Sequence, residues 1–492
     1  MIDLEQIRRD VEACERGMNE EYYLNWSGQK DDLDTASVMD KCPSLGERET
    51  VDHISARRQI AEPEEERKLK YLHGVTVGFY LANLVKDLND AKETEEAKLT
   101  IDVDGEEMAY RMSSVHMVNE DDRAKRHAIH DARIKASEGL NKILLERWGK
   151  LHNTAVDLGY NNYTMLYRNL KGINFTSLLN EIKEFKQRTD KLYMEKMGEM
   201  TDSLGLSLEE AEKHDIAYLL RAKRFDPHFK KGDSLPALKA TLKGLGIDLD
   251  SQKNIIVDIE EREKKTPRAF CAPLDIPSKI MLVTMPQGGY SDYSSLFHEA
   301  GHAEHLGNVN PDEPMEFKYL GDNSVTESFA FTFDYLLTDR NWVNEYIKMP
   351  NVDEYMHHAF VEKLFFVRRY GSKLEYEMKL HTDGLPGMDQ VYKSVMEDGM
   401  VFKHPREHYL LDLDDGFYCA QYLRAWIFHA QLIDLLKEKF GEKWFLNTKS
   451  GNYLTNLWSV GQKYDVVELA QNEGFQGLDI EPLTEEIIAN LE

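Results

Sequence analysis

The sequence has few cysteines, no long hydrophobic run and no basic stripe. Its 492 residues include only four cysteines, which are scattered without regular spacing. A disulfide framework or a cysteine-based zinc site is therefore not indicated. No apolar stretch approaches the roughly 20 residues that a membrane-spanning helix needs. The formal net charge of −27 would repel nucleic-acid phosphates and anionic membranes, so neither is expected as a partner.

The composition instead indicates a globular intracellular protein. Hydrophobic residues make up 41% of the chain, which is ample for a large core. Residues 1–10 are acidic and amphipathic, whereas a secretory signal combines a basic start with an apolar centre. We therefore expect a cytoplasmic protein. The sequence does not predict the oligomeric state.

Two regions differ in their patterns. Residues 1–250 are dominated by helical spacing and are predicted to form a helical wall or lid. Near residues 99–112 the apolar period changes to two on either side of Asp104-Gly105, which predicts a hairpin. Residues 251–492 carry the motifs described below and are predicted to form the zinc-binding catalytic region. Both regions are expected to belong to one continuous fold.

The motif His298-Glu299-Ala-Gly-His302 carries most of the functional information. On a helix, histidines four residues apart share one face, where both imidazoles can bind one metal ion. Glu299 projects beside that ion and can take a proton from an attacking water. This is the His-Glu-x-x-His signature of zinc metallopeptidases. The alternative is an amphipathic helix that matches by chance, but the apolar neighbours favour the catalytic interpretation.

A third protein ligand is needed. A metzincin would have a histidine six residues after His302, but that position holds Asn308. Glu327 lies 25 residues after His302 at the start of an apolar helical segment, near Ser324 and Thr326. An unpaired carboxylate would be costly to bury there. We therefore predict that Glu327 completes a site for one zinc ion per chain. His305 is the rival ligand, although a structural role suits it better.

A short apolar run, residues 280–285, precedes the motif and is predicted to be a strand. A strand that lies next to the metal-binding helix could pair with the backbone of a peptide substrate. An ordinary internal strand is an equally good interpretation of the same pattern.

A second candidate group lies towards the C-terminus. Tyr418, Tyr422 and His429 recur at helical spacing on one face. Such a face often belongs to a core. Peptide hydrolysis, however, builds an oxyanion that needs a hydrogen-bond donor beside the metal, and a tyrosine hydroxyl or an imidazole can supply one.

Together these segments resemble the helical gluzincin peptidases. That group includes the thimet oligopeptidase and oligoendopeptidase F family and the related angiotensin-converting enzyme family. Ala420-Gln421-Tyr422 resembles the thimet oligopeptidase helix, while His408 and Tyr418, ten residues apart, are similar to the converting-enzyme pattern. The resemblance covers roughly residues 266–335 and 404–433.

The resemblance implies a mainly α fold: a two-lobed helical body around a deep substrate channel, with a small β-sheet next to the zinc helix. It also implies that His408 and Tyr418 stabilise the tetrahedral intermediate, whereas the thimet-like alignment favours Tyr422. Relatives often have an acidic residue where this chain has Phe331. Asp334 or Asp292 could take over its role of orienting a histidine.

The predicted function is a zinc-dependent oligopeptidase that cleaves short, unfolded peptides. One alternative is a carboxypeptidase or peptidyl-dipeptidase that requires a free C-terminus. Arg406 bears on this choice, since the converting-enzyme pattern has a basic residue there that holds the terminal carboxylate. A solvated arginine is the simpler interpretation, because Asp415 replaces a tyrosine that helps in that family. A catalytically silent peptide-binding protein is the alternative of another class, and the intact Glu299 argues against it.

Overall fold

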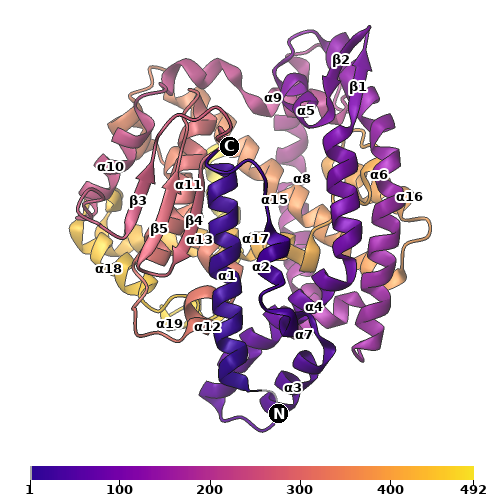
Figure 1. Ribbon diagram of the computed structural model, residues 1–492. Helices are drawn as coiled ribbons and strands as arrows, with labels where there is room; N and C mark the ends of the chain where they lie inside the picture. Colours follow the sequence, from indigo (N-terminus) through magenta and orange to yellow (C-terminus); the bar gives the residue numbers. More distant parts are fainter. Residues whose placement is uncertain (1–2) are drawn as a thin grey trace. The chain divides into compact units, whose positions relative to one another are not determined.

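The structure is a computed structural model that describes residues 3–492. The chain divides into two compact units, each assembled from segments far apart in the sequence. Unit 1 contains the residues up to Tyr80 together with Arg224–Met356 and Arg424–Leu483. Unit 2 contains Leu81–Lys223, His357–Leu423 and Thr484–Glu492. Helices dominate both units (Figure 1), so the predicted mainly α class is confirmed. The predicted functional division at residue 250 stays a prediction.

Unit 1 combines helices with one small sheet. Its elements are α1 (Leu4–Trp26), α2 (Thr35–Met39), α3 (Arg48–Arg58), α10 (Ser234–Gly244), β3 (Ile255–Asp258), β4 (Phe270–Asp275), β5 (Lys279–Val283), α11 (Tyr290–Gly307), α12 (Met315–Tyr319), α13 (Asn323–Asp334), α14 (Arg340–Trp342), α18 (Thr448–Trp458) and α19 (Val466–Asn472).

Unit 2 is built from long helices and one hairpin. Its elements are β1 (Thr100–Val103), β2 (Glu106–Ala109), α5 (Tyr110–Asn119), α6 (Arg123–Asp157), α7 (Tyr163–Lys171), α8 (Phe175–Asp202), α9 (Lys213–Arg221) and α16 (Met388–Met400). Four helices contribute residues to both units: α4 (Pro63–Lys98), α15 (Val352–Asp383), α17 (Tyr418–Phe440) and α20 (Glu481–Leu491). Among the described residues, no helix is long and apolar enough to cross a membrane.

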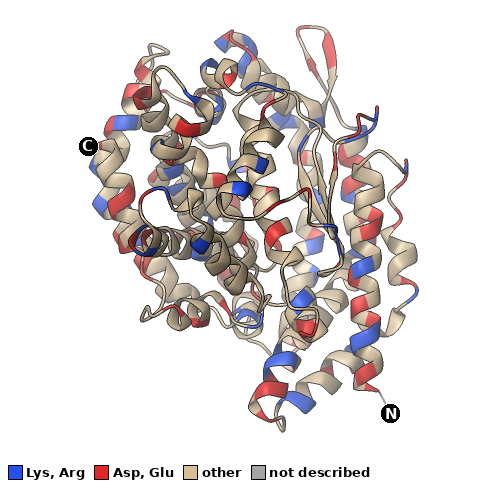
Figure 2. Ribbon diagram, turned by 90° about the vertical axis from the view of Figure 1, so that its left-hand side faces the viewer, with Lys and Arg blue, Asp and Glu red and all other residues tan. Residues whose placement is uncertain are grey.

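The hairpin of unit 2 turns at Asp104-Gly105. The φ angles of these two residues are 55° and 86°, as a two-residue hairpin turn requires. Along the helices in view, Lys and Arg are interspersed with Asp and Glu (Figure 2). The negative net charge is therefore spread among mixed charges on this face.

The sheet of unit 1 has the order β3-β5-β4, in which β5 is parallel to β3 and antiparallel to β4. The strand β5 is the predicted run near residues 280–285, and it is buried and paired on both sides. Its backbone groups are therefore not free to pair with a peptide. The interpretation of β5 as a substrate-pairing strand is wrong, and the internal-strand interpretation holds. If a peptide joins this sheet, it must do so at an edge strand.

The helices α11 and α13 pack unusually close together. A Cβ atom added at Gly301 would lie 2.6 Å from the Cα atom of Ala330 and 2.6 Å from the carbonyl oxygen of Phe329. Only glycine leaves room for the α13 backbone at this point. This contact places the middle of α13 against the motif-bearing helix, which lies next to β4 and β5 (Figure 1).

Candidate metal centre

The helix α11 presents His298 and His302 one above the other. Tyr293, Leu296 and Phe297 are buried on its apolar side and fix its orientation in unit 1. The two imidazole ring centroids lie 4.9 Å apart, and each side chain is 14% exposed. The pair is thus shielded by protein but still reachable from solvent.

Glu327 reaches the same point from α13. The helix begins after Asp322, whose carboxylate caps it by accepting a hydrogen bond from the Ser324 N–H. The cap is therefore Asp322, two residues before Ser324 and four before Thr326, near which the sequence predicted the start of the helix. Arg424 lies 2.8 Å from the Asp322 carboxylate, and this buried ion pair, together with hydrogen bonds from Ser324 and Val466, holds the pKa of Asp322 at about 2 despite its burial. The start of α13 is firmly anchored.

The structure brings His298, His302 and Glu327 together, and we call these three residues the α11–α13 group. Glu327 Oε2 lies 3.4 Å from His298 Nε2 and 3.9 Å from His302 Nε2. The three ligand atoms all lie within 4.8 Å of one another. In a tetrahedral zinc site with bonds near 2.0–2.1 Å, donor atoms stand about 3.4 Å apart. The residues therefore fit a zinc ion with only small side-chain adjustments.

Both histidines have a partner on the ring nitrogen that faces away from this point. His302 Nδ1 lies 2.8 Å from the Thr326 hydroxyl oxygen, within hydrogen-bonding distance. His298 Nδ1 lies 3.7 Å from Asp334 Oδ2, and Asp334 in turn accepts a hydrogen bond from Ser294 at 2.8 Å. Such outer partners orient metal-binding imidazoles. The sequence did not single out Thr326 for this position.

Of the two carboxylates considered for orienting a histidine, Asp334 is the one in place. Asp292 instead accepts hydrogen bonds from the backbone N–H groups of Gln287 and Gly288, ahead of the helix. Phe331, at the position where the resemblance had suggested an acidic residue, packs against the His298 ring at a centroid distance of 5.7 Å. The contact of His298 with Phe331 is therefore apolar, and Asp334 supplies the carboxylate from the next turn.

The electrostatics of the two imidazoles differ. Burial lowers the pKa of His298, but hydrogen bonds and charges from Asp334 and Glu327 outweigh it and raise the pKa to about 10. Burial lowers the pKa of His302, and Glu327 only partly opposes this. Two carboxylates thus converge on His298, and a cation at this position is electrostatically favoured.

His305, the rival ligand, is directed elsewhere. It is fully buried, and its Nε2 atom lies 3.3 Å from the carbonyl oxygen of Gly461. Its ring also packs on Phe329. Burial lowers the pKa of His305 to about 3, so the ring is neutral. These contacts match the structural role that the sequence favoured.

Glu299 points to the sheet. Its Oε2 atom accepts a hydrogen bond of 2.9 Å from the backbone N–H of Cys271, the second residue of β4. Because this N–H bonds to Glu299, it is turned away from β5. The side of β4 opposite β5 therefore lies beside the carboxylate of the motif.

An aromatic cluster that the sequence only partly identified borders the α11–α13 group. Phe331 stacks on Trp426 at a centroid distance of 5.2 Å, and the Trp426 indole N–H donates to the Tyr335 hydroxyl at 2.7 Å. The Tyr335 ring also contacts His429, at 5.2 Å. His429 belonged to the predicted helical face, whereas Tyr335 was missed. The one feature of the sequence that could have identified Tyr335 is its position eight residues after Glu327, on the same side of a helix.

His408, Tyr418 and Tyr422 belong to unit 2. The rings of Tyr418 and Tyr422 lie 5.2 Å apart at the start of α17, and Tyr422 stacks on Tyr370. His408 ends a short 3-10 turn, and its Nδ1 atom lies 3.3 Å from Lys213 Nζ. Burial and the Lys213 charge hold the pKa of His408 well below its usual range.

Arg406 opens the same turn and lies on the surface. Its side chain is 53% exposed, with Nε 3.2 Å from Glu407 Oε1 and Nη1 3.8 Å from Asp389 Oδ2. Two carboxylates already accompany this guanidinium. The arrangement is that of a solvated arginine, which was the simpler interpretation of the sequence.

Unit 2 contains two further groups of potential ligands. Glu377, Asp414 and Cys419 form one of them, but the Lys373 ammonium lies 2.7 Å from Asp414 and supplies the positive charge. The Cys419 thiol donates to Glu377 at 3.2 Å, and burial raises the pKa of both groups. This network is satisfied without an ion. The other group, which contains His127, is described below.

Comparison with known proteins gives a fold and no family. No family model matches the sequence, and no curated protein matches it either. Among solved structures, a putative oligoendopeptidase F from Bacillus anthracis str. Ames is similar to all of this chain over 96% of its own length. The TM-score is 0.69 and the sequence identity is 16%. The chain therefore shares its fold with that protein.

Proposed function

We propose that this protein is a zinc-dependent metallopeptidase that hydrolyses short, unfolded peptides. The observation that carries the proposal is the α11–α13 group, whose three ligand atoms converge within 4.8 Å, with Glu299 next to His298 on the same helix. Two imidazoles and one carboxylate are a common ligand set for catalytic zinc, which keeps a fourth position open. A zinc ion bound here would polarise the scissile carbonyl and promote deprotonation of water.

Glu299 is proposed as the general base. The Cys271 N–H holds one of its carboxylate oxygens, which orients the side chain. The carboxylate takes one proton from a water whose oxygen bonds to the carbonyl carbon of the peptide. It then passes that proton to the leaving nitrogen as the C–N bond breaks. The products are a carboxylic acid, which ionises, and a free amine.

We propose that the substrate backbone lies along the side of β4 that faces Glu299. The Cys271 N–H on this side already bonds to Glu299, so a peptide that runs along β4 would bring a carbonyl near the base. Pairing by strand addition recognises any extended backbone and excludes folded proteins. This explains how short, unfolded peptides would be selected.

His408, Tyr418 and Tyr422 are proposed as oxyanion donors. Because the protonated Lys213 faces Nδ1 of the neutral His408, the ring proton is assigned to Nε2, where it is free for donation. A tyrosine hydroxyl is an equally suitable neutral donor. The carboxylates beside Arg406 support internal cleavage over a C-terminal exopeptidase, because they would repel a terminal carboxylate.

The test is an activity assay coupled to metal removal. A quenched fluorescent peptide of about ten residues is incubated with the purified protein, with chelator-treated protein, and with the latter after addition of one equivalent of Zn²⁺. We expect the untreated protein to cleave the peptide, the chelator-treated protein to lose this activity, and added Zn²⁺ to restore it. Zinc uptake and peptide binding without cleavage would favour the silent peptide-binding alternative. Cleavage that persists in fully metal-free protein would refute a metallopeptidase.

A further inference from the structure

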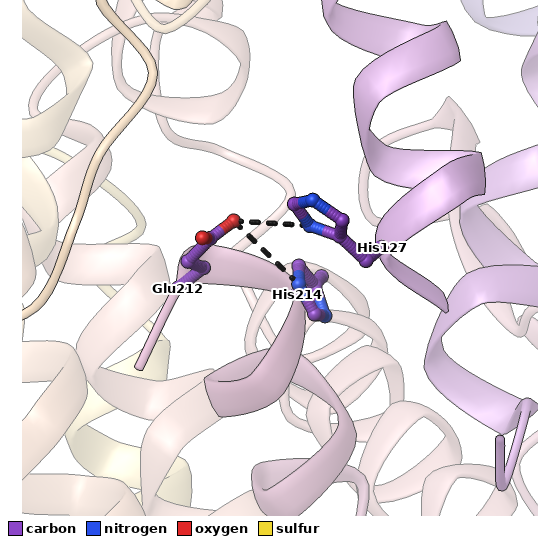
Figure 3. A group of neighbouring side chains, drawn as sticks. All are labelled: His127, Glu212 and His214. Atoms are coloured by element: carbon purple, nitrogen blue, oxygen red, sulfur yellow. Dashed lines mark ion pairs between the residues drawn. The ribbon is translucent and has the colours of Figure 1, made fainter. Parts of the chain in front are cut away.

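Unit 2 contains a second convergence of two histidines and one glutamate. His127 lies on the first turns of α6, while Glu212 and His214 stand at the start of α9, 85 or more residues later. Figure 3 shows both imidazoles directed towards the Glu212 carboxylate. Glu212 Oε2 lies 3.3 Å from His127 Nδ1 and 3.7 Å from His214 Nε2. We call these residues the α6–α9 group.

Three of the four ring nitrogens in this group are buried without hydrogen bonds. His127 Nδ1 and both ring nitrogens of His214 are shielded from solvent and have no hydrogen-bond partner, and the His214 side chain is fully buried. Buried polar atoms are rarely left unsatisfied, and an ion or a water commonly explains those that are.

The outer partners follow the pattern of a metal site. Asp131 Oδ2 lies 3.4 Å from His127 Nε2, and Asp215 Oδ1 lies 3.3 Å from His214 Nδ1. Each histidine therefore faces Glu212 with one nitrogen and has a carboxylate near the other. A carboxylate that hydrogen-bonds to the outer nitrogen orients a metal-binding imidazole and strengthens it as a ligand, and Asp131 and Asp215 lie close enough to form such bonds.

The neighbouring cations leave Glu212 available. Arg123 and Arg126 pair with Asp215, at 2.9 Å and 3.3 Å. Lys403 Nζ lies 4.0 Å from Glu212 Oε1, the carboxylate oxygen that does not face the histidines. The Glu212 side chain also accepts a capping hydrogen bond from the backbone N–H of Asp215. Its Oε2 atom is the oxygen that faces both rings and could share an ion with them.

We propose that His127, Glu212 and His214 bind a second divalent transition-metal ion, with Zn²⁺ the best match. The donor separations of 3.3 and 3.7 Å are close to the roughly 3.4 Å of a tetrahedral site. The His127 side chain is 44% exposed, so the group lies near the surface of unit 2. Because the ligands come from α6 and from the start of α9, the ion would act as a clamp between these two elements.

The experiment is a metal count on the full-length protein. Chelator-treated protein is equilibrated with a twofold excess of Zn²⁺, desalted and measured by mass spectrometry for zinc per chain. His127→Gln and Glu212→Gln are the test variants, because both side chains are partly exposed and their loss should be tolerated. His116→Gln is the matched control, an exposed histidine of unit 2 outside the group. His298→Gln removes a ligand of the α11–α13 group.

The expected result is two zinc ions in the wild type and in His116→Gln, and one in His127→Gln, Glu212→Gln and His298→Gln. A zinc content unchanged by both His127→Gln and Glu212→Gln would overturn the proposal. A zinc content unchanged by His298→Gln would instead count against the α11–α13 group, so the two failures are distinguishable. Co²⁺ uptake gives a second readout: the visible absorption of tetrahedral Co²⁺ should fall by about half in each single-site variant. Asp131→Asn should weaken zinc binding at this group by about tenfold.

Discussion

The α11–α13 group and the α6–α9 group have nearly the same ligand geometry in different surroundings. In each, one glutamate oxygen faces two imidazole nitrogens, at 3.4 and 3.9 Å in the first and 3.3 and 3.7 Å in the second. In the first, Glu299 directly follows the ligand His298 and accepts a hydrogen bond from the edge strand β4. In the second, the nearby carboxylates are Asp131 and Asp215, and they lie on the outer ring nitrogens of the histidines. The difference teaches that metal affinity and catalysis are separate properties: three ligands suffice for binding, whereas hydrolysis needs a base and a place for the peptide.

The largest effect is expected when a metal ligand of the α11–α13 group is removed. His302→Ala and Glu327→Ala should each remove zinc from the α11–α13 group and reduce turnover by far more than the roughly hundredfold typical of a lost general base. Peptide assays and zinc analysis on the same samples measure both effects. His305→Gln is the matched control and should keep zinc. If Glu327→Ala retained full zinc and full activity, Glu327 would not be the third ligand.

The next effect concerns the oxyanion donors. Tyr418→Phe should lower kcat by about a hundredfold or more at nearly constant KM, since losing one such donor costs about 3 kcal/mol of transition-state stabilisation. Tyr422→Phe is the matched variant, one turn along α17 and stacked on Tyr370. Steady-state kinetics separate the two. A strong effect in Tyr422→Phe with near-normal Tyr418→Phe would establish the thimet-like alignment.

A smaller effect should come from the contact that brings Glu327 to the histidines. Gly301→Ala places a Cβ atom 2.6 Å from α13 backbone atoms, and such overpacking costs about 1–3 kcal/mol. We expect a lower midpoint of denaturant unfolding and weaker zinc binding. Gly139→Ala in α6 is the control, because no atom lies within 4 Å of its added Cβ. Equal stability of the two variants would show that the close approach of α11 and α13 is unimportant.

The smallest effect is expected at Arg406. One peptide is prepared with a free and with an amidated C-terminus, and both are cleaved by the wild type and by Arg406→Ala. Arg406 is exposed and lies near Asp389 and Glu407, so it should contribute little to substrate binding. In both enzymes, the cleavage rates of the free and the amidated peptide should therefore differ by less than about threefold. A large loss on amidation that disappears in Arg406→Ala would favour a peptidyl-dipeptidase.

The sequence predicted those parts of the fold and site that depend on local spacing. Histidines four residues apart predicted a shared helical face, and Asp104-Gly105 marked a turn that the structure contains. Glu327 could be proposed because a carboxylate in an apolar helix needs a partner. The mainly α class was implied by the resemblance to the helical gluzincin peptidases, and the helical spacing of residues 1–250 agreed with it.

The remainder depends on tertiary contacts. Whether β5 is an edge or an internal strand is decided by β3 and β4, which pair with it from both sides. Sequence spacing did not show that Asp334 rather than Asp292 faces His298. Likewise, the α6–α9 group joins His127 to two residues that follow it 85 and 87 positions later, and no short motif marks it.

The central claim is that the α11–α13 group performs chemistry because Glu299 accompanies it, and Glu299→Gln tests this most directly. Glu304→Gln is the matched control: it alters the other glutamate of α11, which is buried and hydrogen-bonded to Gln252 and Asn308. Zinc content and turnover are measured for both. The account predicts wild-type zinc in Glu299→Gln with turnover at least about a hundredfold lower, and near-normal turnover in Glu304→Gln. Wild-type turnover in zinc-loaded Glu299→Gln would contradict it.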